Sequence, residues 1–203
     1  MLDKIALKRT ILVFGEIVPQ TYCDIRDQLM KLASESSDPI TILLDSNGGN
    51  YLCAIQLGDI IRHLPLVTIG IAIDAVSSAL VILQYCTKRL IMPSGRVLIH
   101  SVRIEAKNLS DDEHFEKRVE GFKKLHHSHT RRMIDLFHDR TGLSEERIRE
   151  LIKRGDDLLY HIPSAEALEL NMVDGIVPED YKLLIPPPPE KKEESPSNGK
   201  DEI

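Results

Sequence analysis

Residues 67–86 read VTIGIAIDAVSSALVILQYC, and the rest of the architecture can be worked out from this segment. Val67–Ala72 is predominantly apolar and of strand length, which predicts a strand that is buried on both faces. Ser77–Cys86 is predominantly apolar and predicts a buried helix. Small residues fill the short connection, so the chain turns tightly from strand to helix. A buried strand leading directly into a helix is typical of α/β folds with parallel sheets.

The same alternation continues in both directions. Upstream, the pattern predicts strands over Thr10–Phe14 and Ile40–Leu44, helices over Tyr22–Ala33 and Tyr51–His63, and a turn at Asp45–Asn50. Downstream, it predicts short strands at Leu90–Met92 and Arg96–His100, a long helix starting at Ser110 and ending at Thr141-Gly142, helices over Leu143–Arg154 and Ser164–Leu170, and a final strand over Met172–Val177. The sequence predicts a capping box from Ser110 and Glu113, and a further N-cap at Ser144. The whole pattern favours an α/β fold with mostly parallel strands.

The long helix carries an unusual run of histidines. Apolar and histidine side chains recur along one face at steps of three or four, namely Phe115, Val119, Phe122, His126, His129, Met133 and Phe137. His126, His127 and His129 could in principle share a metal ion, but no carboxylate or cysteine completes a site. We therefore expect no metal, and we expect His126 and His129 to be buried at a helix or subunit contact.

Composition excludes several classes of protein. The 203 residues include 26 basic and 32 acidic side chains, and the resulting net charge of −6 argues against a nucleic-acid partner. There is no apolar run of membrane-spanning length, no signal-peptide pattern and no pairing pattern among the three cysteines. We expect a cytoplasmic protein without a membrane partner. One domain is predicted over residues 1–180, and a proline-rich, charged and disordered tail over residues 181–203.

Three features near strand ends combine into a candidate catalytic site. Ser77 opens a helix, where a serine is either an N-cap or a nucleophile beside backbone N–H groups that can stabilise an oxyanion. Gly48 and Gly49 follow a buried strand, where they form either a tight turn or a close backbone approach to a ligand. His100 ends another strand, and an imidazole there could take the proton of a serine hydroxyl.

Several motifs, taken in order, resemble the proteolytic subunit of the Clp protease family. They are residues 14–17 (FGEI), 38–49 (DPITILLDSNGG), 88–100 (KRLIMPSGRVLIH), 164–167 (SAEA) and 172–174 (MVD). The resemblance runs from Lys8 to Asp180. It implies a Clp protease/crotonase-like spiral of β-β-α units with a long projecting helix. It also implies a serine endopeptidase that needs no cofactor.

The resemblance assigns the nucleophile. Non-housekeeping branches of the family carry an A-S-A-A-V run that matches residues 76–80, which makes Ser77 the nucleophile and His100 its base. Ser78 is the competing hydroxyl. The spacing of the housekeeping branch would instead place Val76 at the nucleophile position, and the chain would then be a catalytically silent scaffold subunit.

The acid and the oxyanion hole follow from the same resemblance. The family places the acid of its triad upstream of the SAEA motif, where Asp157 fits if the turn is two residues longer, with Asp156 as the alternative. The region of Gly48 and Gly49, together with the backbone N–H of Ser78, would form the oxyanion hole. The acid would orient His100 and stabilise its charge.

The resemblance also implies an assembly. Members of the family form stacked heptameric rings, so we expect a homo-oligomer that cleaves peptides or unfolded proteins. They work with an AAA+ unfoldase through a longer N-terminal segment. Only about seven residues precede Lys8 here, which weakens the case for dependence on such a partner. A crotonase-like acyl-CoA enzyme, which shares the oxyanion hole without a serine nucleophile, is the remaining alternative.

Overall fold

The computed structural model describes residues 4–104, 114–178 and 182–184. Its strands are β1 (Lys4–Ala6), β2 (Thr10–Ile17), β3 (Ile40–Gly49), β4 (Thr68–Val76), β5 (Lys88–Leu98), β6 (Ile162–Pro163), β7 (Gly175–Ile176) and β8 (Lys182–Leu184). Its α-helices are α1 (Pro19–Glu35), α2 (Tyr51–His63), α3 (Ser78–Tyr85), α4 (Phe115–Thr141), α5 (Glu145–Gly155) and α6 (Ser164–Glu169).

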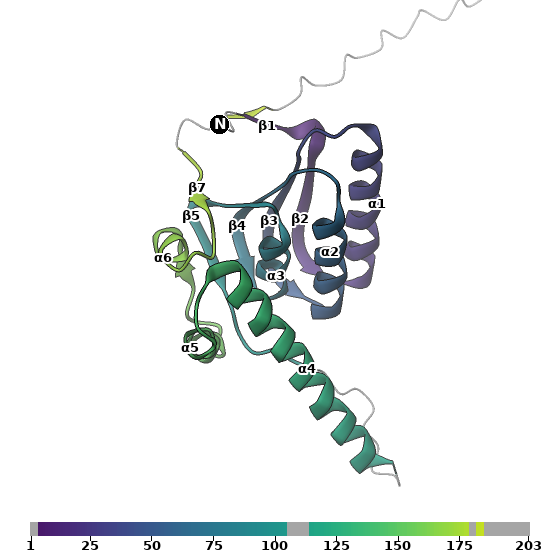
Figure 1. The fold of residues 1–203 in the computed structure, drawn as a ribbon, viewed down its shortest axis with the longest axis vertical. Coiled ribbons are helices and arrows are strands. Elements are labelled where there is room, and N and C mark those ends of the chain that lie inside the picture. Colours follow the sequence, from purple (N-terminus) through teal and green to yellow (C-terminus); the bar gives the residue numbers. More distant parts are fainter. Residues whose placement is uncertain (1–3, 105–113, 179–181, 185–203) are drawn as a thin grey trace, which may run out of the picture.

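The main sheet has the strand order β2-β3-β4-β5-β6, and β7 pairs with β5 beside this path. Strands β2 to β5 are parallel to one another, whereas β6 runs antiparallel to β5. Helices α1, α2 and α3 pack on the sheet and form its main core (Figure 1). The predicted α/β fold with mostly parallel strands is therefore confirmed.

The central strands are buried on both faces, as their continuous apolar runs predict. On β3, Ile42 and Leu44 belong to the core formed with the helices. Leu43 lies between them in sequence and joins a second, smaller cluster on the opposite face. In that cluster Leu43 pairs in register with Ile71, and Ile71 with Leu90. Burying each such side chain contributes about 1.5–3 kcal/mol.

Three local predictions are wrong. The final strand expected over Met172–Val177 is only the short β7, and β8 follows it in the chain. The glycine-rich segment expected as a turn continues β3 as far as Gly49, because Gly48 pairs with Glu16 and Gly49 with Ile17 of the neighbouring strand. The two short strands expected around residues 93–95 form the single strand β5. A register shift between Ala72 and Asp74 on β4 lets the pairing continue past this segment.

Helix α4 projects from the body of the molecule (Figure 1). It ends at Gly142, which has a φ of 75° and supplies the left-handed residue typical of a helix C-terminus. His126 and His127 are exposed in the single chain. The buried side chains of α4 lie in its C-terminal part and are Met133, Ile134, Leu136, Phe137 and Thr141. The capping box predicted at Ser110 lies outside the described residues.

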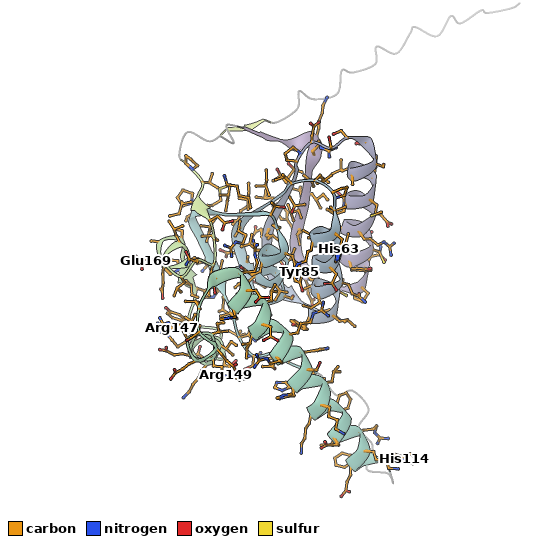
Figure 2. The ribbon with its side chains drawn as sticks, viewed as in Figure 1. His63, Tyr85, His114, Arg147, Arg149 and Glu169 are labelled. Carbon is orange, nitrogen blue, oxygen red and sulfur yellow. The ribbon has the colours of Figure 1, made fainter. Side chains whose placement is uncertain are left out.

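The other capping serine is confirmed. Ser144 accepts a hydrogen bond from the backbone N–H of Arg147 at 3.2 Å and starts α5. Arg147 and Arg149 lie on this helix (Figure 2). Arg147 pairs with Glu150, and Arg149 pairs with Glu145. None of the helices in the described ranges has the length and hydropathy that a membrane crossing requires.

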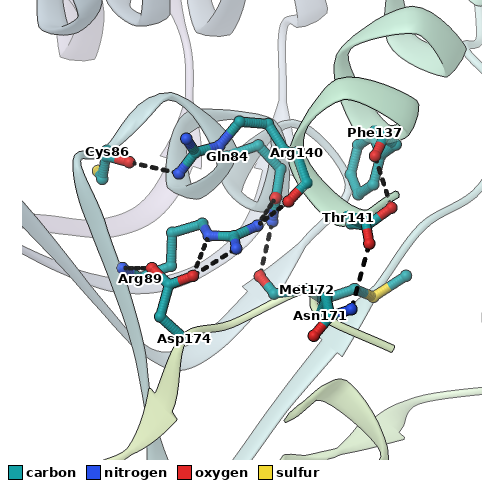
Figure 3. Close-up of polar contacts among 9 residues, drawn as sticks. All are labelled: Gln84, Cys86, Arg89, Phe137, Arg140, Thr141, Asn171, Met172 and Asp174. Atoms are coloured by element: carbon teal, nitrogen blue, oxygen red, sulfur yellow. Dashed lines mark hydrogen bonds and ion pairs between the residues drawn. The ribbon is translucent and has the colours of Figure 1, made fainter. Parts of the chain in front are cut away.

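A buried arginine joins four segments of the fold (Figure 3). Arg89 of β5 forms an ion pair with Asp174, which precedes β7. Its Nη1 donates to Gln84 of α3 at 2.7 Å and to the carbonyl oxygen of Arg140 of α4 at 3.2 Å. Arg140 in turn donates to the carbonyl oxygen of Cys86 at 2.9 Å. These contacts fix α4 and the β7 segment against the sheet.

The first and last strands, β1 and β8, pair with each other. Strand β8 pairs in parallel with β1, from Lys182 opposite Lys4 to Leu184 opposite Ala6. The predicted tail from residue 181 thus begins at a strand, and residues 185–203 lie outside the described part of the chain. The predicted domain boundary stays a prediction.

Candidate active site

Ser77 occupies a strained turn between β4 and α3. Its φ of 58° and ψ of −122° are unusual for a residue with a side chain, and such conformations cluster at functional sites. Its N–H donates to Leu98 of β5 at 2.8 Å, and its carbonyl oxygen accepts from Val81 at 3.3 Å. Its side chain makes no capping hydrogen bond, so Ser77 is not an ordinary N-cap. Ser77 is partly exposed, whereas Val76 and Ser78 are buried.

The paired glycines let the end of β3 approach this turn. A Cβ atom on Gly48 would lie 2.7 Å from the Cβ of Ser77 and 2.7 Å from the carbonyl oxygen of Val76. The φ of Gly48 is +91°, which L-amino acids rarely adopt. At Gly49 a Cβ atom would lie 2.4 Å from the carbonyl oxygen of Ile17. Both positions therefore require glycine for close packing.

The backbone donors near Ser77 differ in availability. Ser78 is the first residue of α3, so its N–H has no acceptor within the helix. The N–H of Gly48 donates instead to Ser46 Oγ at 3.1 Å. Gly49 lines the cavity described below, and Gly48 is not among the lining residues. Of the residues expected to supply the oxyanion hole, Ser78 and Gly49 line the cavity, whereas the N–H of Gly48 is bonded to Ser46.

His100 follows directly after β5. Its Nδ1 lies 2.7 Å from the carbonyl oxygen of Ser101, so Nδ1 carries the proton and donates, and Nε2 has a free lone pair. Burial lowers the pKa of the His100 imidazole below its usual 6.5, and the positive charge of Arg103 lowers it further. The hydrogen bond to Ser101 and the negative charge of Asp156 oppose this shift. The ring is therefore neutral near pH 7 and can accept a proton.

Ser77 and His100 line the same cavity, whose volume is about 980 Å³. Apolar side chains from α3 and α4, including Val81 and Met133, form part of its wall. Within the described residues no hydrogen bond joins Ser77 to His100. Catalytic hydrogen bonds are often long when no substrate is bound. The relevant observation is that Ser77 and His100 line one cavity.

The structure separates the two candidate acids. The carboxylate of Asp157 accepts a hydrogen bond from the N–H of Leu159 at 3.0 Å, within its own turn. The carboxylate of Asp156 bonds to Ser101, the residue that follows the imidazole. In the part of the chain that the structure describes, neither carboxylate bonds directly to His100. The structure thus shows Asp157 bonded within its own turn, whereas the carboxylate of Asp156 contacts Ser101, the residue next to His100 in the chain.

His129 is the one member of the histidine run at this cavity. Its ring lies 5.1 Å from that of Tyr51, and the Tyr51 hydroxyl donates to the His129 carbonyl oxygen at 3.1 Å. Among the described residues no group of three or more histidine, cysteine, aspartate or glutamate side chains is arranged to hold a metal ion.

Two residues that position parts of the site were not predicted from the sequence. Ser46 fixes the glycine segment, since its Oγ donates to Gly15 at 2.5 Å and accepts from Gly48. The backbone carbonyl oxygen of Ser101 accepts the hydrogen bond that His100 Nδ1 donates. Any residue type supplies a carbonyl, so the sequence contains no signal for the second contact. The first could be suspected only from the serine in the D-S-N-G-G motif.

A serine at a strained strand-to-helix turn and a neutral imidazole in one cavity is an arrangement used by hydrolases that work by acyl transfer. Residues 1–180 match the family model described as Clp protease. The chain therefore belongs to the Clp protease family, which supports a peptidase function.

The individual relatives agree with this placement. The ATP-dependent Clp protease proteolytic subunit 2 of Pseudomonas aeruginosa is 25% identical over 189 residues, covering 89% of this chain and 87% of the relative. Subunit 3 of Rhizobium meliloti is 27% identical, covering 83% of each. The structure of ClpP1 from Listeria monocytogenes is 26% identical with a TM-score of 0.64, and that of a mutant of the same ClpP1 is 25% identical with a TM-score of 0.70. Each covers 83% of this chain and 91% of the solved one.

Proposed function

We propose that the chain is a serine endopeptidase in which Ser77 is the nucleophile and His100 the general base. The observation that carries the proposal is the conformation of Ser77. Ser77 has a positive φ, is partly exposed and makes no capping hydrogen bond, and it lines the same cavity as His100.

The reaction would proceed in two halves. Nε2 of His100 takes the hydroxyl proton of Ser77 while Oγ attacks the peptide carbonyl carbon, giving a tetrahedral intermediate. The imidazolium then gives its proton to the leaving amine, the peptide C–N bond breaks, and an acyl-enzyme remains. Water, deprotonated by His100, releases the acyl group and restores the serine.

Backbone donors would stabilise the negative oxygen of the intermediate. The N–H of Ser78 is supported by the N-terminal dipole of α3, and Gly49 lines the same cavity at the end of β3. The Gly48 N–H would join them only if its bond to Ser46 opened. Loss of one such donor raises the barrier by about 3–4 kcal/mol.

We extend the proposal to the assembly. The names of the relatives describe proteolytic subunits of ATP-dependent proteases. The N-terminal part of α4 projects, and there Phe122 is only partly buried and Leu125 is 44% exposed. Such side chains suit contact with another copy of the chain. We accordingly propose a ring-shaped homo-oligomer in the cytoplasm that receives unfolded chains.

A fluorophosphonate probe tests the function, because it reacts covalently with activated serines. We expect labelling of the purified protein at Ser77, loss of labelling in Ser77→Ala, and labelling that persists in Ser78→Ala. Cleavage of a casein substrate should disappear together with labelling. Labelling at Ser78, or no labelling at all, would contradict the assignment. Acyl-CoA turnover that survives Ser77→Ala would indicate a crotonase-like enzyme instead.

A further inference from the structure

The orientation of His100 depends on a single backbone atom. The only hydrogen bond of the ring within the described residues is the one from Nδ1 to the carbonyl oxygen of Ser101. A general base works only if its free nitrogen points at the nucleophile, so whatever fixes Ser101 also fixes the direction of Nε2.

Ser101 is held by one carboxylate at two points. Its backbone N–H donates to Asp156 Oδ1 at 2.8 Å, and its hydroxyl donates to Asp156 Oδ2 at 3.0 Å. Arg103 donates from Nη2 to the backbone carbonyl oxygen of Asp156 at 2.9 Å and so also holds the aspartate. Two parallel bonds define the position of a peptide unit far better than one, particularly when the acceptor is charged.

The packing of α5 brings this carboxylate into place. Gly155 ends the helix, and a Cβ atom there would lie only 2.0 Å from the carbonyl oxygen of Ile99. The end of α5 can thus lie against the residue that precedes His100 only because position 155 has no side chain. Asp156 follows at once and meets Ser101.

We infer, building on the proposed function, that Asp156 is a positioning residue for His100 that acts through Ser101 rather than by touching the imidazole. The carboxylate holds the Ser101 peptide, the Ser101 carbonyl holds Nδ1–H, and Nε2 is thereby aimed into the cavity. Asp156 also contributes negative charge near the ring. Among the described residues, the other charged or titratable groups near the ring are Arg103 and, around the cavity, Glu16, Tyr51, His129 and His161.

The inference makes a distinctive prediction about pH. The charge of Asp156 raises the pKa of His100 against the opposing effect of burial. Removing that charge lowers the pKa, so the imidazole stays unprotonated to a lower pH. The acid limb of a rate profile governed by His100 must then move to lower pH. A merely structural loss would reduce the active fraction and leave the limb where it was.

The test is the rate of fluorophosphonate labelling of the full-length protein between pH 5 and pH 8. For Asp156→Asn we expect labelling slower by roughly 10-fold to 100-fold at pH 8, as misdirected catalytic groups typically show, with an acid limb at lower pH than in the wild type. Ser101→Ala, which keeps the backbone bond and loses the hydroxyl bond, should slow labelling less. Asp139→Asn removes an exposed carboxylate on α4 and serves as the matched control, with no change expected.

The outcomes separate the two proposals. A wild-type protein that is not labelled at Ser77 overturns the proposed function and the inference with it. If the wild type is labelled at Ser77, but Asp156→Asn and Ser101→Ala show the same labelling rates and the same acid limbs as the wild type, the inference alone is overturned. A larger loss and limb shift in Asp157→Asn than in Asp156→Asn also overturns it, since the role then belongs to Asp157. Far-ultraviolet circular dichroism of each variant verifies folding.

Discussion

Replacing Asp174 by alanine removes the charged partner of a buried arginine. The Arg89 side chain is only 5% exposed, so its charge has almost no access to water. Asp174 accepts from the Arg89 backbone N–H at 2.7 Å, from Nε at 3.1 Å and from Nη2 (Figure 3). After the substitution the guanidinium keeps two partners, Gln84 and the Arg140 carbonyl, neither of which carries a negative charge on the bonded oxygen.

The cost follows from burial. Removing one partner of a buried ion pair costs about 3–5 kcal/mol, because the other charge is left uncompensated. The Asp174 side chain is 36% exposed and two acceptors remain for Arg89, so the lower end of the range applies, about 3 kcal/mol. The matched control is Asp74→Ala. Asp74 pairs with Arg96, whose side chain is 51% exposed, and such surface pairs contribute about 0–1 kcal/mol.

Urea denaturation measures both effects. The two variants and the wild type are unfolded at one protein concentration and pH 7, with circular dichroism as the signal, and the free energies of unfolding are compared. We expect Asp174→Ala to lose about 3 kcal/mol and Asp74→Ala less than about 1 kcal/mol. Equal losses in the two variants would refute the reasoning, because burial of the arginine would then make no difference.

Two further predictions concern the same network and the glycine segment. Burial opposes ionisation of Asp174, but the hydrogen bonds and charge of Arg89 outweigh it and hold the pKa of the carboxyl below its usual 3.8. The ion pair therefore stabilises the folded protein above that pH, and this stabilisation is lost as the pH falls through the folded-state pKa. The difference in the free energy of unfolding between the wild type and Asp174→Asn, measured by urea denaturation, should therefore shrink below about pH 4. We expect Gly48→Ala to lower the free energy of unfolding by at least about 1–3 kcal/mol and the rate of Ser77 labelling at least tenfold. The reasons are the positive φ at this position and the two contacts of 2.7 Å that the new Cβ atom would make. Gly121→Ala in α4, where a Cβ atom meets nothing within 4 Å, is the control and should be neutral or stabilising by about 0.5–1 kcal/mol; equal losses in the two variants would contradict the packing argument.

The elements that were predicted well are those with a local signal. Apolar runs identified the buried strands, and Ser144 and Gly142 marked helix ends through hydrogen bonds or backbone conformations confined to a few residues. The D-S-N-G-G segment was mistaken for a turn because glycine pairs usually mark turns. Here it stays extended because Gly48 and Gly49 pair with β2, a partner some thirty residues earlier in the chain.

The candidate site shows the same division. Ser77 and His100 could be proposed from the sequence because each follows a recognisable strand, and the ends of parallel strands meet at one edge of a sheet. The choice between Asp156 and Asp157 could not be made from the sequence, since two adjacent residues in a turn differ only in the direction in which their side chains point. That direction comes from the contact of Gly155 with Ile99, which joins α5 to β5.

By itself, the sequence determined the order of strands and helices, the burial of the sheet and the small-residue turn at Ser77, because periodicity and backbone preference act over a few neighbouring residues. Only the tertiary structure decided that Gly48 approaches Ser77, that the imidazole bonds to a main-chain carbonyl, and that Asp156 holds that carbonyl's residue. The first and the last of these contacts join segments up to 55 positions apart, and their geometry depends on how whole elements pack, which no local pattern encodes. The bond between the imidazole and the carbonyl joins neighbouring residues, but any residue type supplies a carbonyl, so the sequence gives no sign of it.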